Sequence, residues 1–296
     1  MTRMYNSPKI PVSLIFAAAF ILISTFSSAH AENPIGFSAG LQTQNPCSPS
    51  SSLELNGAYW KGYLDDAKSI VISPFQWQTR DWITASLTIG ATYGLYSLDA
   101  ENMEESQEFR NGSSNAVSGF AKHFGDGKYS LPPLGILYLY GHFKNDERAR
   151  DASLLGLESF LISGILTQAI KSIAHRDRPN SGDPYNEWDG PGFGLSDLSF
   201  PSGHSSAAFS IATVIALEYK DTAYIPPVVY GIAALTALSR VNDNAHWSSD
   251  IFIGSSLGYF TAKAIVNSHE SRGKHALCVF PVLTGRDVSI TVARPF

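Results

Sequence analysis

The run FPSGHS at residues 200–205 is the stretch around which the rest of the chain is organised. Two further polar segments accompany it, KSIAHRDRP at 171–179 and SRVNDNAHWSSD at 239–250. The apolar runs between and around these segments have the periodicity of helices. Together the three segments predict one active site.

Three cations stand in these segments among residues that are otherwise mostly apolar or small: Lys171, Arg178 and Arg240. Burying a cation costs several kcal/mol unless an anion compensates its charge. Arginine presents a planar fork to pairs of phosphate oxygens, and lysine supplies a compact charge. Ser202 reads as a helix N-cap, where free N–H groups point at anions, and Gly203 lets the backbone come close. The set predicts a site for a tetrahedral oxyanion.

Two histidines and an aspartate are the candidate catalytic residues. Asp250 follows His246 by four residues, so on a first helical turn the carboxylate lies on the same face as the imidazole. It can then fix the tautomer of His246 and hold this histidine as a nucleophile. His204 remains free to protonate a leaving oxygen and later to activate water.

The three segments fill the patterns K-x(6)-R-P, P-S-G-H and S-R-x(5)-H-x(3)-D. In this the chain resembles the type 2 phosphatidic acid phosphatase superfamily, which also contains bacterial class A acid phosphatases and vanadium haloperoxidases. The resemblance covers about residues 145–267 and implies an all-α helical bundle.

Carried over residue by residue, the resemblance also implies a role for each site residue. His246 takes the phosphoryl group, Asp250 orients it, and His204 is the general acid. The implied phosphate-binding residues are Lys171, Arg178, Ser202, Gly203 and Arg240. A lone histidine or a lone Ser-Gly pair is usually structural, but the joint occurrence of the whole set favours a functional site.

Three functions are compatible with these residues. The favoured one is a metal-independent phosphatase that hydrolyses soluble or lipid phosphomonoesters through a phosphohistidine, with vanadate as an inhibitor. The second is a vanadium haloperoxidase, in which the same residues hold vanadate as a cofactor and His246 is its ligand. The third is a cell-envelope protein that binds phosphate without turnover, although binding alone does not require the two histidines and Asp250.

The N-terminal residues 1–31 read as a secretory signal. Arg3 and Lys9 precede or flank the apolar run 12–26, and Ala-His-Ala at 29–31 is a cleavage site. This predicts export to the periplasm, with an uncleaved membrane anchor as the alternative. The formal charge is −5 and no basic cluster is present, which argues against a nucleic-acid partner.

The cysteines allow a disulfide, and the sequence has no pattern typical of a metal site. Cys47 and Cys278 are the only cysteines, and an oxidising compartment permits one disulfide between them. Their pairing is left open, because its geometry cannot be read from sequence. The sequence contains no C-x-x-C or His-rich run, so it predicts no metal site. The acidic stretch 99–108 reads as a solvated loop or a frayed helix.

With 296 residues and 44% hydrophobic content, the chain can bury one large core. A Gly-rich loop at 180–199 is expected to cover the active site as a lid. The predicted parts of the chain are a signal peptide at 1–31, an extended arm at 32–58, a helical phosphatase domain at 59–268 and a C-terminal β-hairpin at 269–296, with strands at 277–283 and 288–294.

The uncharged runs after the signal are short for membrane spans. The longest, 82–98 and 222–239, fall below or at the limit of the roughly 20 apolar residues that a span needs. Charges in other helices, such as Glu158 and Lys263, suit a bundle whose outer face meets water. We therefore expect a protein that is soluble or lies against a membrane surface, with an integral-membrane lipid phosphatase as the alternative.

Overall fold

In the computed structural model the described residues are 53, 55, 57–192, 198–275, 278–284 and 287–293. Helices dominate this part of the chain, which confirms the all-α prediction. The α-helices are α2 (Gly57–Ile72), α3 (Thr79–Tyr96), α4 (Asp99–Glu108), α5 (Gly112–Ala121), α6 (Gly127–Lys144), α7 (Glu147–Ala174), α8 (Gly203–Glu218), α9 (Ile225–Asn242) and α10 (Ser248–His275). Short 3-10 turns are η2 (Ser73–Gln76), η3 (Lys122–Gly125) and η4 (Pro179–Ser181).

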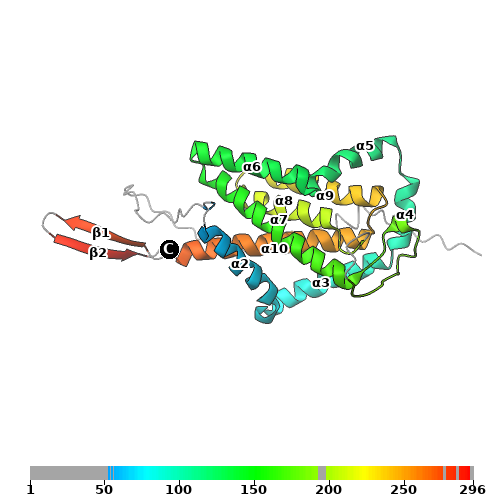
Figure 1. Cartoon of the computed structure of the whole chain (residues 1–296), viewed down its shortest axis with the longest axis horizontal. Helices are drawn as coiled ribbons and strands as arrows, with labels where there is room; N and C mark the ends of the chain where they lie inside the picture. The colour runs from blue at the N-terminus through cyan, green and yellow to red at the C-terminus, as the bar shows by residue number, and fades with distance from the viewer. Residues whose placement is uncertain are drawn as a thin grey trace, which may run out of the picture.

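Helix α8 is at the centre of the bundle and packs against α7, α9 and α10. Figure 1 shows α8, α9 and α10 running roughly along the long axis, with α7 inclined to them and α6 next to α7. Phe209 and Val214 of α8 and Ile251 of α10 are at most 2% exposed and belong to the core between these helices. Each such side chain contributes roughly 1.5–3 kcal/mol through burial.

Two glycines allow α10 to approach α8 closely. A Cβ atom at Gly254 would collide with the carbonyl oxygen of Ser202, and one at Gly258 would collide with that of Ser206. Any side chain at these positions would push the two helices apart. Because Ser202 belongs to the predicted site, this contact fixes the start of α8 against the start of α10.

The acidic stretch 99–108 forms the regular helix α4, with Asp99 and Asn102 buried. The prediction of a solvated loop or frayed helix is therefore wrong. Glu158 of α7 is also fully buried, so it does not belong to a surface that meets water. In both cases, neighbouring helices cover charges that local composition assigned to solvent.

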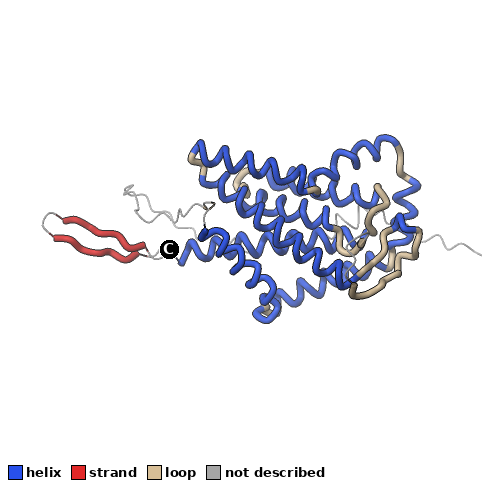
Figure 2. Tube along the Cα trace, in the orientation of Figure 1, coloured by secondary structure: helices blue, strands red, loops and turns tan. Residues whose placement is uncertain are grey.

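The C-terminal tail forms two strands, β1 (Cys278–Thr284) and β2 (Asp287–Ala293). They pair antiparallel, with Cys278 opposite Ala293 and Thr284 opposite Asp287. Figure 2 shows this pair beyond the end of α10, which continues to His275, past the expected boundary at residue 268. The signal, the arm to residue 52, Cys47 and the side chain of Cys278 lie outside the described residues, so the cleavage and disulfide predictions stay predictions.

One helix among the described residues, α7, is long and apolar enough to cross a membrane. Half of its most apolar window is buried inside the bundle. The uncharged runs 82–98 and 222–239 fall largely in α3 and α9, which do not meet the same criterion. Length and composition alone are weak evidence for a span, because a buried core helix passes the same test.

Candidate active site

The three predicted segments meet where four helices begin or end. Lys171 is in the last turn of α7, and Arg240 is in the last turn of α9. Ser202 is the N-cap of α8, and Asp250 lies in the first turn of α10. The backbone N–H of Ser202 donates to the carbonyl oxygen of Asp250 at 3.0 Å, which ties the second segment directly to the third.

The start of α8 is a capped helix N-terminus, as the sequence predicts. The Ser202 hydroxyl accepts from the backbone N–H of Ser205 at 3.4 Å, so the predicted N-cap is present. A Cβ atom at Gly203 would meet only a methyl group of Thr167, at 3.9 Å. The side of the first turn at Gly203 is therefore open enough for another group to approach its N–H donors.

The three predicted cations act together on His204. Burial is the largest cause that lowers the pKa of His204, and the charges of Arg240, Arg178 and Lys171 lower it further, to about 4. The 3-10 turn η3 packs behind this histidine, because a Cβ atom at Gly125 would overlap its backbone. The structure thus brings the cations and the proposed acid together.

Some hydrogen-bond donors of these cations have protein partners and others do not. The Lys171 ammonium donates to the carbonyl oxygens of Leu198 and Ser199 at 2.6 and 3.1 Å. Arg240 pairs with Asp243. Among the described residues, the buried Nε of Arg178 has no hydrogen-bond partner. We call Lys171, Arg178, Arg240 and the N-terminus of α8 the phosphate cradle.

His246 is buried, and burial lowers its pKa to about 4. The expected helical turn over 246–250 is not formed, because α10 begins at Ser248. His246 Nδ1 lies 3.8 Å from Asp250 Oδ2, which is too far for a hydrogen bond. Ser199 Oγ is closer to both, at 3.4 Å from Nδ1 and 2.5 Å from the carboxylate. Ser199, which the sequence analysis did not identify, therefore contacts both the imidazole of His246 and the carboxylate of Asp250.

Asp250 is also bound by a second residue that the sequence analysis did not identify, Arg176. This guanidinium is fully buried and donates to Asp250 Oδ1 at 2.7 Å. It donates equally closely to Asp99 Oδ2, at 2.8 Å, and to the carbonyl oxygen of Tyr185, at 2.7 Å. Burial by itself raises the pKa of the Asp250 carboxyl, but its contacts with His246 and Arg176 outweigh burial and lower it.

Aromatic rings enclose the same guanidinium. The ring centroids of Tyr96, Trp188 and Trp247 lie 5.0, 5.1 and 5.3 Å from the central carbon of Arg176. Such contacts strengthen when the cation is removed from water. The rings hold Arg176 in one orientation, and through it the Asp250 carboxylate.

Asp99 completes this cluster from the start of α4. Its oxygens accept from the Ser248 hydroxyl at 2.6 Å and from the hydroxyl and N–H of Ser249 at 2.5 and 2.9 Å. We call Arg176, Asp99, Asp250 and Ser249 the Arg176 network. A signal was present in the sequence, since Arg176 stands inside the first segment and a buried arginine requires acidic partners.

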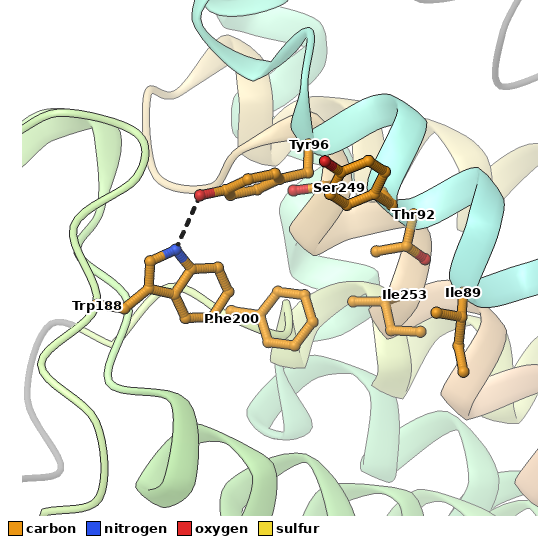
Figure 3. A pocket seen from close by; sticks show the side chains of 8 residues that line it. Ile89, Thr92, Tyr96, Trp188, Phe200, Ser249 and Ile253 are labelled. Carbon is orange, nitrogen blue, oxygen red and sulfur yellow. Dashed lines mark hydrogen bonds between the residues drawn. The ribbon is translucent and has the colours of Figure 1, made fainter.

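An apolar pocket of about 310 Å³ opens beside the site. Figure 3 shows Phe200 between Trp188 and Ile253, with Ile89 and Thr92 on the far side. The Trp188 indole donates to the Tyr96 hydroxyl at 3.2 Å and closes one end. Trp188 belongs to the predicted lid loop, so the described part of this loop lines a pocket. Phe200 and Ser249 also line it, and each lies within two residues of a site residue.

A sequence profile described as the PAP2 superfamily matches residues 153–274, which contain all three segments. The decaprenylphosphoryl-5-phosphoribose phosphatase of Mycobacterium tuberculosis is 32% identical over 133 residues, covering 45% of this chain and 69% of that protein. The lipid A 1-phosphatase of Porphyromonas gingivalis is 38% identical over 66 residues, covering 22% of this chain and 15% of the relative.

A probable lipid phosphate phosphatase 4 of Arabidopsis thaliana is 29% identical over 163 residues, covering 45% of this chain. The chain spans 52% of this plant protein and only 15% of the Porphyromonas protein. Similarity to these two proteins is therefore confined to part of each.

Proposed function

The chain belongs to the PAP2 superfamily, and from this premise we propose that it hydrolyses phosphate monoesters carried by lipids. The names of the three relatives support the reaction, since each is a phosphatase of a lipid or lipid-linked phosphate. The arrangement of the phosphate cradle around His204, next to a buried His246, is the observation that carries the proposal.

Substrate binding follows from the cations. A phosphate dianion among Lys171, Arg178 and Arg240 meets three positive charges and the N–H groups at the start of α8. It also supplies an acceptor for Arg178 Nε, which has no hydrogen bond among the described residues. Because these groups already compensate the charge of the phosphate, we propose that the reaction uses no metal cofactor.

Two histidines then exchange a phosphoryl group and a proton. The neutral imidazole of His246 attacks phosphorus, and the bond to the ester oxygen breaks as His204 donates a proton to that oxygen. The alcohol leaves, and His204, now neutral, takes a proton from water. The oxygen of this water attacks phosphorus and breaks the bond to His246. Phosphate leaves, and both histidines return to their starting states.

The pKa values fit these roles when substrate is included. With a pKa of about 4, His246 is neutral at pH 7 and can act as a nucleophile. Burial is the largest cause of the low pKa of His204, but Arg240, Arg178 and Lys171 add to it. A phosphate anion bound among these cations offsets their charges, so substrate binding raises the pKa of His204 and favours its acid form.

The apolar pocket supports a lipid rather than a soluble substrate. It lies next to Phe200, and α3 presents apolar side chains beside it, of which Ile89 and Tyr93 are 65% and 70% exposed. An acyl or prenyl chain in the pocket would leave its phosphate near the cradle. We propose that the exported protein lies against a membrane surface through this face of α3.

The reaction is tested with the purified mature protein. Phosphate release from dioleoyl phosphatidate in detergent micelles is compared with release from p-nitrophenyl phosphate, and a higher kcat/KM is expected for the lipid. In His246→Ala, turnover of both substrates should fall by about four orders of magnitude. A phosphoryl label should remain on wild-type protein after alkaline denaturation and be absent from this variant. Full activity in His246→Ala would remove the mechanism.

The pocket is tested by filling it. Ile253→Trp should raise KM for dioleoyl phosphatidate about tenfold and leave p-nitrophenyl phosphate hydrolysis unchanged, because only the lipid needs the pocket. Val228→Trp, on an exposed part of α9, is the matched control. Equal effects of Ile253→Trp on both substrates would contradict the assignment of the pocket to the lipid chain.

Vanadate and cell fractionation test the remaining parts of the proposal. Vanadate should inhibit phosphate release competitively, because the cradle fits a five-coordinate phosphoryl group. Bromide oxidation by the vanadate-loaded protein, faster than its phosphatase turnover, would favour the haloperoxidase alternative.

Carbonate should release the protein from membranes of cells that express it. Retention until detergent is added would instead favour an integral-membrane lipid phosphatase.

A further inference from the structure

A second group of titratable side chains lies away from the phosphate cradle, where α2, α7 and α10 meet. Asp66 comes from α2, Glu158 from α7 and His269 from α10. Figure 1 shows α2 lying against the C-terminal half of α10. Along α7, Glu158 and Lys171 are separated by about 20 Å, at 1.5 Å per residue. The group is therefore separate from the site described above.

Glu158 is the member that points to a ligand. Its side chain is fully buried, and among the described residues neither carboxylate oxygen has a hydrogen bond. A buried carboxylate without hydrogen bonds is strongly destabilising. Its Oε2 lies 3.4 Å from His269 Nε2, so the unbonded carboxylate faces the other members of the group.

Two of the distances within the group match those between ligands of one metal ion. His269 Nε2 lies 3.0 Å from Asp66 Oδ2 and 3.4 Å from Glu158 Oε2, and all three ligand atoms lie within 4.8 Å of one another. Two ligands about 2.1 Å from the same ion are about 3.0 Å apart at a right angle and about 3.4 Å apart at the tetrahedral angle. Neither contact of Nε2 has hydrogen-bond geometry, since this nitrogen is without a hydrogen bond among the described residues.

The group also carries a negative charge that a cation could balance. Arg272 donates to both oxygens of Asp66, at 2.8 and 2.6 Å, and Ser268 donates to Oδ1 at 2.9 Å. Arg272 balances one of the two carboxylates, so with a neutral imidazole one buried negative charge remains. Each carboxylate oxygen has two lone pairs, and Asp66 Oδ2 can therefore bind both Arg272 and an ion.

We propose that Asp66, Glu158 and His269 bind one divalent transition-metal ion, of which Zn²⁺ is the test case. An imidazole and two carboxylates suit Zn²⁺ or Mn²⁺ better than Ca²⁺ or Mg²⁺, which prefer oxygen ligands alone. The ion joins α2 to the bundle formed by α7 and α10. The site has a structural role, and it takes no part in the hydrolysis proposed above.

The test uses the full mature chain without an affinity tag, because a histidine tag would bind the ion itself. The protein is treated with a chelator, dialysed against Zn²⁺ and then against buffer, and its zinc content and thermal unfolding are measured. We expect about one zinc per chain and a rise in Tm of roughly 5 °C over the chelated protein. Phosphatase activity at low temperature should not change with zinc content.

Variants locate the ion. Glu158→Gln and His269→Asn should each retain less than about a tenth of the wild-type zinc, and zinc should no longer raise their Tm. His269→Cys should retain zinc, because a thiolate can replace the imidazole. His142→Asn, which changes an exposed histidine of α6, should bind zinc as the wild type does.

Two results would overturn the proposal, and both use wild-type protein, so they hold even if a variant fails to fold. The first is that neither Zn²⁺ nor Mn²⁺ is retained after dialysis. The second is that the retained metal leaves the Tm of the wild-type protein unchanged. In either case the group would be an ion-pair cluster in which a protonated His269 lies between the two carboxylates.

Discussion

The Arg176 network and the group formed by Asp66, Glu158 and His269 lie near opposite ends of α10 and contain similar residues, but they use their hydrogen-bonding capacity differently. In the network, Arg176 binds two carboxylates, a hydroxyl and a carbonyl oxygen. In the group, both oxygens of Glu158 are without hydrogen bonds among the described residues. A buried charge whose bonds are complete holds other residues in place. A buried charged group that lacks hydrogen-bond partners indicates a ligand. The same reasoning distinguishes Arg176, whose hydrogen bonds are made within the protein, from Arg178, whose Nε has no partner among the described residues.

The largest expected effect on stability comes from removing the arginine of the Arg176 network. Arg176→Leu leaves Asp99 and Asp250 buried without their cation, so we expect the free energy of unfolding to fall by about 3–5 kcal/mol. Urea unfolding measures this loss. Arg148→Leu is the control, because it removes an exposed ion pair with Asp221 and a cation–π contact with Tyr219 and should change stability by about 1 kcal/mol or less. Equal losses in both variants would mean that the Arg176 network does not stabilise the fold.

Arg178 should show the opposite behaviour. Arg178→Ala removes a charge that is incompletely bonded in the protein, so we expect little change in the urea midpoint. Loss of a charge-assisted hydrogen bond to substrate is worth about 1.5–3 kcal/mol, so kcat/KM should fall roughly 10- to 150-fold. Inorganic phosphate should also inhibit the variant less. A large loss of stability with unchanged kcat/KM would place Arg178 in the structural class with Arg176.

A smaller effect is expected at the link between the network and the nucleophile. Ser199→Ala removes the hydroxyl between Asp250 and His246, which should lower kcat about tenfold and shift the acid limb of its pH profile. The matched control is Ser206→Ala, since the buried hydroxyl of Ser206 has no hydrogen bond among the described residues. If both variants behave alike, Ser199 has no part in aligning His246.

The smallest expected effect is a pH dependence of substrate capture. Burial, with a contribution from Arg178, lowers the pKa of Lys171 to about 8. Lys171 therefore loses its charge as the pH rises through this value, and kcat/KM, which reports the free enzyme, should fall about twofold at pH 8 and further above it. Lys171→Arg should keep its charge and lose this dependence. A fall in kcat/KM that persists in Lys171→Arg would assign the titration to another group.

Several features were predictable because they depend on local order in the sequence. The all-α architecture follows from helical apolar runs, and the N-cap at Ser202 follows from a serine that precedes such a run. Lys171 and Arg240 lie in the last turns of α7 and α9, and His246 lies in the loop before α10, so three short segments were sufficient to indicate the site residues. The predicted direct turn from His246 to Asp250 was wrong in detail, because the helix begins later, at Ser248.

The sequence by itself indicated the residues of the phosphate cradle and the two histidines, His204 and His246, to which we assign the proposed reaction. Only the tertiary structure decided that Asp99 is a buried partner of Arg176, while its acidic neighbours Glu101 and Glu104 stay at the surface. It also decided that Asp66, Glu158 and His269 lie together, although no local pattern connects them. The reason is physical: burial and hydrogen bonding depend on which helices pack against a side chain, and this packing joins residues that are far apart in the chain.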